Sequence, residues 1–253
     1  IEGDKNHNTT LYVKRLDVSI GKKNIANAEI TLGDSLVYNT TEQTQGIKSV
    51  TVDNLNVTYD ISGNTATDAG EYTLTVTANG NFKGEKTQKF TVARKTVTAN
   101  VTVNGTYTYN GKAIEPTDVI VKDVDTEIPK NEYTLSYADN TNAGTAAVTV
   151  ADTNGGNYAV SGRGEFVINK ASVKVKPKDI TKVYGDEPKF ELESDSELIT
   201  QEKLAEFAQT AEFTSVGSAE TAPVNKYKIS VKLKDEDKDK ETNLIINDDG
   251  TGM

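Results

Sequence analysis

Apolar and polar side chains alternate along most of this chain with a period of two residues. Tyr72, Leu74 and Val76 share one face of such a stretch, and Val97 and Ala99 begin another. Because successive side chains of a β-strand point to opposite faces, the alternation predicts strands with one buried face. Asn, Asp and Gly gather between the stretches and are typical of turns. The pattern therefore predicts a mainly β protein with short connections.

Residues 200–208 depart from this alternation and predict a short helix. Thr200 is a favourable N-cap residue, and Glu202 complements the positive N-terminal end of a helix. Leu204 and Phe207 fall on one face at the helical period. We therefore expect one helix in the C-terminal part of an otherwise β-rich chain.

One phrase occurs twice in the sequence. Residues 67–76 read T-D-A-G-E-Y-T-L-T-V, and residues 141–150 read T-N-A-G-T-A-A-V-T-V. A recurring pattern of this size predicts a tandem array of small domains. Each phrase precedes Gly-Asn and two aromatic residues that lie eight positions apart, which we expect to anchor the cores: Phe82 and Phe90 in the first repeat, Tyr158 and Phe166 in the second.

The repeats suggest three units after a short leader. We expect residues 1–23, with short strands over 10–13 and 16–20, to be a leader strand or the tail of a preceding domain. We expect 24–94 and 95–170 to be two related β-domains, and 171–253 to be a third. The third unit lacks the closing strand of the other two, so we expect it to be truncated or completed by another segment. Its strand-strand-helix-strand order also fits a β-grasp-like variant.

Several dipeptides predict the connections. We expect Gly70 and Gly144 to turn into the long strands, and Gly80-Asn81 and Gly156-Asn157 to form the next turns. Asn110-Gly111 is a strong two-residue hairpin signal.

The joints between the units are short. Arg94-Lys95 and Lys170-Ala171 join the units without a Pro/Ser/Gly-rich spacer. Short connections restrict domain motion, so we expect a semi-rigid rod.

The composition narrows the classes of partner. The formal net charge of −10 disfavours phosphate backbones, so nucleic-acid binding is not expected. No apolar run approaches the roughly 20 residues that span a bilayer, so no membrane insertion is expected. The chain has no cysteine, which excludes thiol catalysis and Cys-zinc sites. Its one histidine, His7, excludes His-based triads and two-His zinc sites.

Candidate chemistry is sparse, so we expect no enzyme, no cofactor and no metal. Gly162-Arg163-Gly164 lacks the strand-to-helix context of a phosphate-binding loop and reads as turn glycines. The acidic run at 235–239 lacks the spacing of an EF-hand and reads as a solvated hairpin tip. Calcium at a domain junction and an intramolecular Lys–Asn crosslink stay open alternatives. The candidates for glycan contact are the tyrosines nearest to turns: Tyr107, Tyr109 and Tyr158.

Three motifs resemble modules of bacterial cell-surface proteins. D-A-G-E-Y at 68–72, with G-N-F and F-T-V at 80–92, resembles the Ig-like repeats of large bacterial surface proteins. Y-N-G-K-A-I-E-P at 109–116 looks like the same kind of repeat. V-K-P-K-D-I-T-K-V-Y-G-D at 175–186 resembles the start of an MBG-type domain of bacterial adhesins. The resemblance spans about 24–250 and implies three tandem Ig-like β-sandwich-type domains in an elongated array.

This resemblance also implies a function. Such repeats form stalks and adhesive regions, so we expect a non-catalytic structural and adhesive module of an extracellular protein, anchored through its parent to the cell wall or outer surface. Its expected partners are a host glycan or extracellular-matrix protein and the neighbouring repeats of the parent chain. Two alternatives stay open: a dedicated glycan-, mucin- or matrix-protein-binding module, and an accessory region of a secreted carbohydrate-active enzyme.

Overall fold

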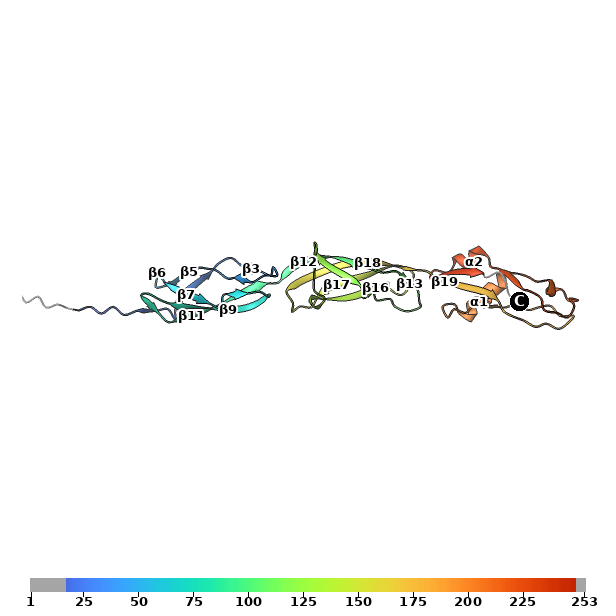
Figure 1. Ribbon diagram of the computed structural model, residues 1–253, viewed down its shortest axis with the longest axis horizontal. Helices are drawn as coiled ribbons and strands as arrows, with labels where there is room; N and C mark the ends of the chain where they lie inside the picture. Colours follow the sequence, from blue (N-terminus) through green and yellow to red (C-terminus); the bar gives the residue numbers. More distant parts are fainter. Residues whose placement is uncertain (1–16, 249–253) are drawn as a thin grey trace, which may run out of the picture. The chain divides into compact units, whose positions relative to one another are not determined.

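A computed structural model describes residues 17–248 of the chain (Figure 1). The protein is mainly β, as the alternating pattern predicts, and it divides into two compact units with the boundary between Lys95 and Thr96. The finer division into three units, at 24–94, 95–170 and 171–253, stays a prediction from the sequence.

The first unit contains two principal sheets and two short strand pairs. One sheet has the order β3-β11-β9-β7 and the other the order β2-β5-β6, while β1 pairs with β10 and β4 with β8. The strands are β1 (Lys23–Asn24), β2 (Glu29–Leu32), β3 (Leu36–Val37), β4 (Gln43–Thr44), β5 (Ile47–Val52), β6 (Leu55–Asn56), β7 (Tyr59–Ser62), β8 (Thr65–Ala66), β9 (Gly70–Ala78), β10 (Phe82–Lys83) and β11 (Glu85–Ala93).

The long hairpin of β9 and β11 supplies much of the first core. Leu74 and Val76 of β9 are fully buried, and Phe90 of β11 lies directly opposite Tyr72. The two rings stack with their centroids 5.5 Å apart. Phe82 is buried as well, so both aromatic anchors predicted for this repeat are confirmed.

The second unit begins with a larger sheet of order β15-β14-β12-β18-β17-β16, in which β13 also pairs with β18. Tyr158 and Phe166 of β18 are buried, as predicted. The elements are β12 (Lys95–Val103), β13 (Tyr107–Thr108), β14 (Val119–Asp123), β15 (Thr126–Glu127), the 3₁₀ turn η1 (Lys130–Glu132), β16 (Tyr133–Ala138), β17 (Gly144–Asp152) and β18 (Tyr158–Asn169).

The two repeated phrases fold in the same way. Each phrase forms the first strand of a long antiparallel hairpin, β9 with β11 and β17 with β18. In each case a short earlier strand pairs in parallel with the end of the second strand, β3 with β11 and β13 with β18. Gly70 and Gly144 begin the long strands, as predicted. At Gly144 the φ angle of 138° disfavours a residue with a Cβ, which explains the glycine.

The remaining segment, 171–248, has a different topology. Its first strand, β19, pairs in parallel with its last strand, β23, over five residue pairs, and also pairs with β20. The elements are β19 (Ala171–Pro177), β20 (Leu192–Glu193), α1 (Gln201–Thr210), β21 (Glu212–Thr214), the 3₁₀ turn η2 (Val216–Ser218), β22 (Ser230–Lys232), α2 (Asp235–Asp239) and β23 (Leu244–Asp248).

Helix α1 confirms the helix predicted over 200–208. The Thr200 hydroxyl accepts the amide hydrogen of Lys203, which caps the N-terminus. Leu204 and Phe207 are buried, as expected for the apolar face. They pack in one core with strands β19 and β23.

The prediction for 235–239 was wrong, because these residues form the short helix α2 rather than a hairpin tip. The Asp237 carboxylate accepts hydrogen bonds from the Thr210 hydroxyl and the Lys240 ammonium, at 2.6 and 2.9 Å. The bond from Thr210 ties α2 to the end of α1. An acidic run can therefore adopt helical structure when neighbouring cations and a hydroxyl group satisfy its carboxylates.

Two turn predictions in the second repeat were also wrong. Asn110-Gly111 forms no two-residue hairpin; instead the Asn110 side chain accepts the Lys112 amide hydrogen in a local turn. Gly162 and Gly164 lie inside strand β18 rather than in a turn. A Cβ at either position would come within 2.9 Å of the Val101 side chain, so these glycines allow strand β12 to pack closely against β18.

The strands expected in the leader, over 10–13 and 16–20, are not confirmed. Residues 17–20 form no strand, and Val18 and Ile20 are exposed, so the strand expected over 16–20 is not present in that described part. An isolated apolar alternation without a pairing partner gains no ladder hydrogen bonds. The strand expected over 10–13 and His7 lie outside the described residues.

Candidate functional site

The three tyrosines proposed from the sequence do not form one exposed cluster. Tyr158 is 3% exposed, so its ring belongs to the core of the second repeat. The Tyr107 ring packs edge-on against Phe166 with centroids 5.3 Å apart, and its hydroxyl donates to the Asn104 carbonyl. Both rings therefore serve packing within the second repeat.

Tyr109 lies where the second repeat meets the segment 171–248. Its amide donates to the Asn169 carbonyl, and its half-buried ring packs against the cores of both parts. Leu198 is packed against one of these cores, and its side chain lies near Gly111. Tyr109 is therefore a junction residue of the second unit.

The Asn243 side chain strengthens this junction. It accepts the amide hydrogen of Ala143 at 2.8 Å and donates to the Asn142 side chain at 3.0 Å. Nearby, the Lys170 ammonium donates to the Glu241 carbonyl at 2.9 Å. These hydrogen bonds join the repeat phrase of the second repeat to the loop before β23.

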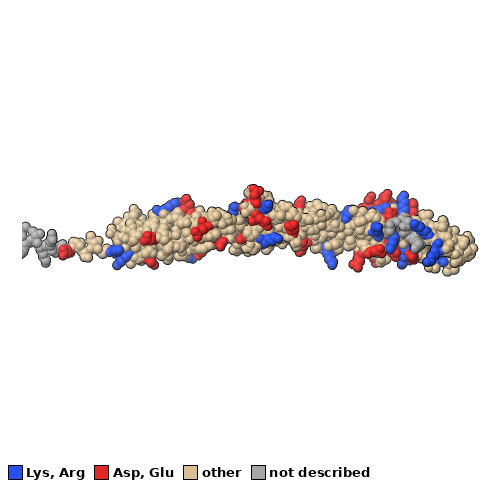
Figure 2. All heavy atoms as spheres, in the orientation of Figure 1, with Lys and Arg blue, Asp and Glu red and all other residues tan. Residues whose placement is uncertain are grey.

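Charged side chains give no metal centre in the described part of the chain. Within residues 17–248, no group of three or more His, Cys, Asp or Glu side chains is placed to hold a metal ion. Figure 2 shows acidic and basic side chains interspersed over the C-terminal part of the visible face. Many form exposed pairs, such as Lys178 with Glu191 at 2.7 Å. Such pairs add little stability individually.

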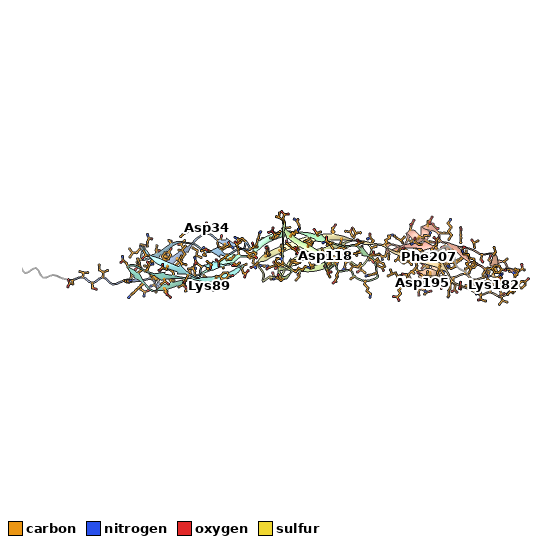
Figure 3. The ribbon with its side chains drawn as sticks, viewed as in Figure 1. Asp34, Lys89, Asp118, Lys182, Asp195 and Phe207 are labelled. Atoms are coloured by element: carbon orange, nitrogen blue, oxygen red, sulfur yellow. The ribbon has the colours of Figure 1, made fainter. Side chains whose placement is uncertain are left out.

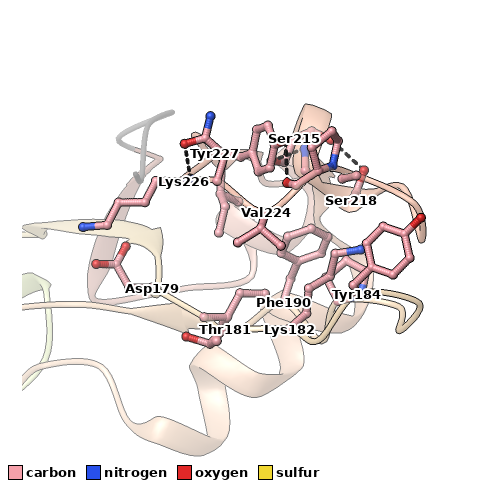
Figure 4. Close-up of a pocket in the computed structure, with 17 residues that line it drawn as sticks. Asp179, Thr181, Lys182, Tyr184, Phe190, Ser215, Ser218, Val224, Lys226 and Tyr227 are labelled. Atoms are coloured by element: carbon pink, nitrogen blue, oxygen red, sulfur yellow. Dashed lines mark hydrogen bonds between the residues drawn. The ribbon is translucent and has the colours of Figure 1, made fainter.

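A concavity lies between two loops of the segment 171–248 (Figure 4). It has a volume of ≈ 500 Å³, a size typical of small-molecule sites. One wall comes from residues 179–190, which follow β19, and the other from residues 215–229, which surround η2.

Lys182, which is labelled in Figures 3 and 4, connects the two walls of this pocket. Its ammonium donates to the carbonyls of Asp186, in its own loop, and Ala219, in the opposite loop, at 3.0 and 2.5 Å. The Gly185 amide also crosses between the loops and donates to the Glu220 carbonyl at 3.0 Å. The Lys182–Ala219 and Gly185–Glu220 bonds join the two loops, so they limit how far the walls can separate.

Aromatic and aliphatic side chains form the apolar part of the pocket. The Phe190 ring is stacked on Phe213 at 4.9 Å, which fixes its orientation. The Tyr227 hydroxyl donates to the Pro223 carbonyl at 2.7 Å. A Cβ at Gly217 would come within 2.5 Å of Tyr227, so a larger residue there would displace this ring.

The sequence reasoning missed this pocket. The phrase V-Y-G-D at 183–186 echoes Y-N-G at 109–111, but the structural setting differs. Tyr184 is 63% exposed, whereas Tyr109 is half-buried at the junction. The two loop walls carry no periodic pattern of apolar residues, so the sequence offered no further signal for the pocket.

No helix among residues 17–248 has the length and apolar character to cross a bilayer. Comparison with known proteins gives no family assignment: no protein-family model matches the chain, and neither a curated protein nor a solved structure shows significant similarity to it.

Proposed function

We propose that this chain is a non-catalytic structural and adhesive module of a bacterial cell-surface or secreted protein, and that it carries tensile load between its neighbours. The proposal rests on the arrangement of the terminal strands in the segment 171–248. Its first strand, β19, and its last strand, β23, are parallel neighbours.

This arrangement determines how the segment responds to pulling. When the chain is pulled from both ends, parallel terminal strands slide along each other, so their hydrogen bonds are loaded together rather than one after another. Five residue pairs, from Ala171 with Leu244 to Val175 with Asp248, share that load. The buried side chains Val173 and Ile246 add packing resistance along the same line.

The two repeats support the same function. In both, a short early strand pairs in parallel with the end of the last strand, and one residue separates that last strand from the next part of the chain: Arg94 and Lys170. A tensile load on one repeat is therefore transmitted to the next part of the chain through a connection of a single residue. This continuity favours a stalk over a set of independent domains.

We propose further that the repeats are Ig-like sandwiches. In the first repeat the Tyr72 hydroxyl donates to the Asp68 carbonyl, four residues upstream, at 2.9 Å. The tyrosine corner of immunoglobulin-like domains has this arrangement. The sheets of order β3-β11-β9-β7 and β2-β5-β6 contribute side chains to one core cluster, which supports this assignment. Nuclear Overhauser contacts between side chains of the two sheets would support this assignment.

Single-molecule force spectroscopy of the full chain tests the load-bearing function. We expect discrete rupture events, and Ile245→Pro should lower the force of one event because proline removes an amide hydrogen from β23. Ile245→Ala is the matched control: the side chain is 51% exposed, and alanine keeps the amide. Gradual extension at low force without discrete ruptures would contradict the proposal.

Localisation needs a separate experiment in the source organism. If the parent protein is displayed outside the cell, antibodies against this chain should label intact cells, and added protease should remove the label. Signal that appears only after cell lysis would contradict the surface assignment. An accessory role beside a carbohydrate-active enzyme would instead be favoured if a catalytic domain adjoins this chain in its parent.

A further inference from the structure

The pocket between residues 179–190 and 215–229 has an unusual rim. Tyr184 at 63% exposed and Val224 at 97% exposed both line it, and the exposed side chains Val183 and Val216 lie next to lining residues in sequence. Large, exposed apolar side chains that line a pocket favour a contact site.

From this geometry we propose that the pocket binds a neutral saccharide. The proposal deepens the adhesive function proposed above, because it identifies the part of the module that makes contact with a ligand. It commits to a sugar without a carboxylate or sulfate group as the ligand class.

The apolar lining fits the faces of a sugar ring. A pyranose presents C–H groups on its faces and hydroxyl groups around its edge, so it packs its faces against flat or aliphatic side chains. Phe190 and Tyr227 line the pocket with rings held by other contacts, and Val224 lies between them in Figure 4. Rings fixed in advance lose little conformational freedom on binding.

The polar lining fits the edge of a sugar ring. The side chains of Asp179, Thr181 and Lys226 line the pocket and form no hydrogen bond with another residue in the described part of the chain. The Tyr184 hydroxyl is likewise without a partner among residues 17–248. These groups offer an acceptor, a donor and two hydroxyls, the mixture that sugar hydroxyls require.

Charge argues for a neutral ligand. Lys182 already donates to the Asp186 carbonyl of its own loop and to the Ala219 carbonyl of the opposite loop, so its ammonium is engaged in joining the walls. Asp179 and Lys226, which Figure 4 shows at one end of the pocket, contribute opposite charges. An anion would gain from Lys226 but would meet the Asp179 carboxylate.

A saccharide fits better than an apolar docking partner. A protein partner that buried the exposed valines would also cover Asp179, Thr181 and Lys226, and their polar groups would need replacement hydrogen bonds. A sugar supplies those bonds from its hydroxyl groups. The cavity volume of ≈ 500 Å³ also matches a ligand of one to a few sugar rings.

The test is a titration of the full chain with neutral hexoses, N-acetylhexosamines and their short oligosaccharides, followed by NMR chemical shifts. Sialylated and sulfated oligosaccharides form the comparison arm. We expect neutral sugars to shift the signals of residues 179–190 and 215–229. Tyr184→Ala and Val224→Asp should each weaken binding by about tenfold, through loss of a packing face.

Val124→Asp is the matched control for Val224→Asp. Val124 is 73% exposed on the loop between β14 and β15, and its φ of 54° suits aspartate better than valine. The substitution Val124→Asp adds the same negative charge at a position away from the pocket, so sugar binding should stay unchanged. Melting temperatures of all variants confirm that each is folded.

Three outcomes would overturn the proposal. They are no shift with any neutral sugar up to high millimolar concentration, binding confined to the anionic sugars, and binding that both pocket variants leave intact. None of these results bears on the rupture forces of the stalk, so the two proposals fail separately.

Discussion

The two repeats provide different hydrogen-bond acceptors for equivalent backbone amides at the end of the long hairpin. Each long hairpin has an edge strand beside it, β7 in the first repeat and β16 in the second. The residue before that strand is Thr58 in the first and Glu132 in the second. Its carbonyl accepts the amide hydrogen of the residue that follows the long strand, Asn79 at 2.9 Å and Thr153 at 3.3 Å. The two positions are therefore structural equivalents.

The difference between them follows from loop length. Three residues separate β9 from β10, whereas five separate β17 from β18. In the short loop, the Phe82 amide donates to the Asn79 carbonyl at 3.1 Å. In the long loop, the Tyr158 amide donates to the buried Glu132 carboxylate at 3.1 Å. A Cβ at Gly156 would overlap that carboxylate, so the glycine leaves room for it. A longer loop thus needs a longer side chain to satisfy the same buried amide.

The hairpins also differ opposite the shared phenylalanine. Tyr72 faces Phe90 in the first repeat, and Ala146 faces Phe166 in the second. The second repeat supplies aromatic contacts from other strands. The rings that contact Phe166 are Tyr107 of β13, at 5.3 Å, and Tyr137 of β16, at 6.3 Å. Equivalent folds can therefore fill the same volume from different positions in the sequence.

The largest effect should come from removing the shared phenylalanines. Phe90→Ala and Phe166→Ala should each destabilise their own repeat by about 3–5 kcal/mol, because a buried ring leaves a cavity. Chemical denaturation followed by NMR can resolve the parts separately. A loss below about 1 kcal/mol in one repeat would show that its core tolerates the cavity, and the two would then not be equivalent.

The next largest effect should come from Glu132. Glu132→Ala removes the carboxylate that accepts from the buried Tyr158 amide, so the second repeat should lose about 1–3 kcal/mol. Glu132→Gln is the control, since its amide oxygen can still accept that hydrogen bond and should recover most of the loss. Equal stability of the alanine and glutamine variants would argue against the loop-length explanation.

A smaller effect is expected at the first hairpin. Tyr72→Phe keeps the ring stacked on Phe90 but removes the hydroxyl that bonds to Asp68, so the unfolding free energy of the first repeat should fall by about 1 kcal/mol. Equilibrium unfolding in urea measures the change. An unchanged midpoint would mean that ring packing alone holds this corner.

The smallest effect expected is a loss of stability in acid that is specific to the segment 171–248. Hydrogen bonds from Thr210 and Lys240 lower the pKa of Asp237. At Asp248, burial raises the pKa, but hydrogen bonds from Leu233 and Lys238 outweigh burial, so the pKa of Asp248 is lowered as well. A lowered folded-state pKa gives stability that is present above the unfolded pKa, near 4, and is lost as the pH falls through the folded value.

We therefore expect this segment to lose stability as the pH falls from about 5 towards 2, and Asp237→Asn to reduce that dependence. Thermal unfolding monitored from pH 7 to pH 2 measures it. The same slope in wild type and variant would show that Asp237 is not linked to folding.

The sequence predicted those features that depend on local periodicity. The aromatic anchors at 82, 90, 158 and 166 and the helix at α1 follow from spacing and capping, which a short window contains. The pocket does not, because Lys182 meets Ala219 across 37 residues of sequence. Gly162 and Gly164 were misread for a related reason: their role depends on Val101, a residue of another strand. Contacts between distant segments leave no mark in a local pattern.

The Asn243 bridge bears on how such chains can evolve by exchange of modules. A rearranged gene that carried only 171–248 elsewhere would separate Asn243 from Ala143 and Asn142, and it would separate Leu198 from Tyr109. In the transplanted segment, the Asn243 side chain would lack these hydrogen-bond partners and the Leu198 side chain would lose its apolar contact. Duplication and shuffling should therefore favour cuts near Lys95, so that residues 96–248 are inherited together as one piece.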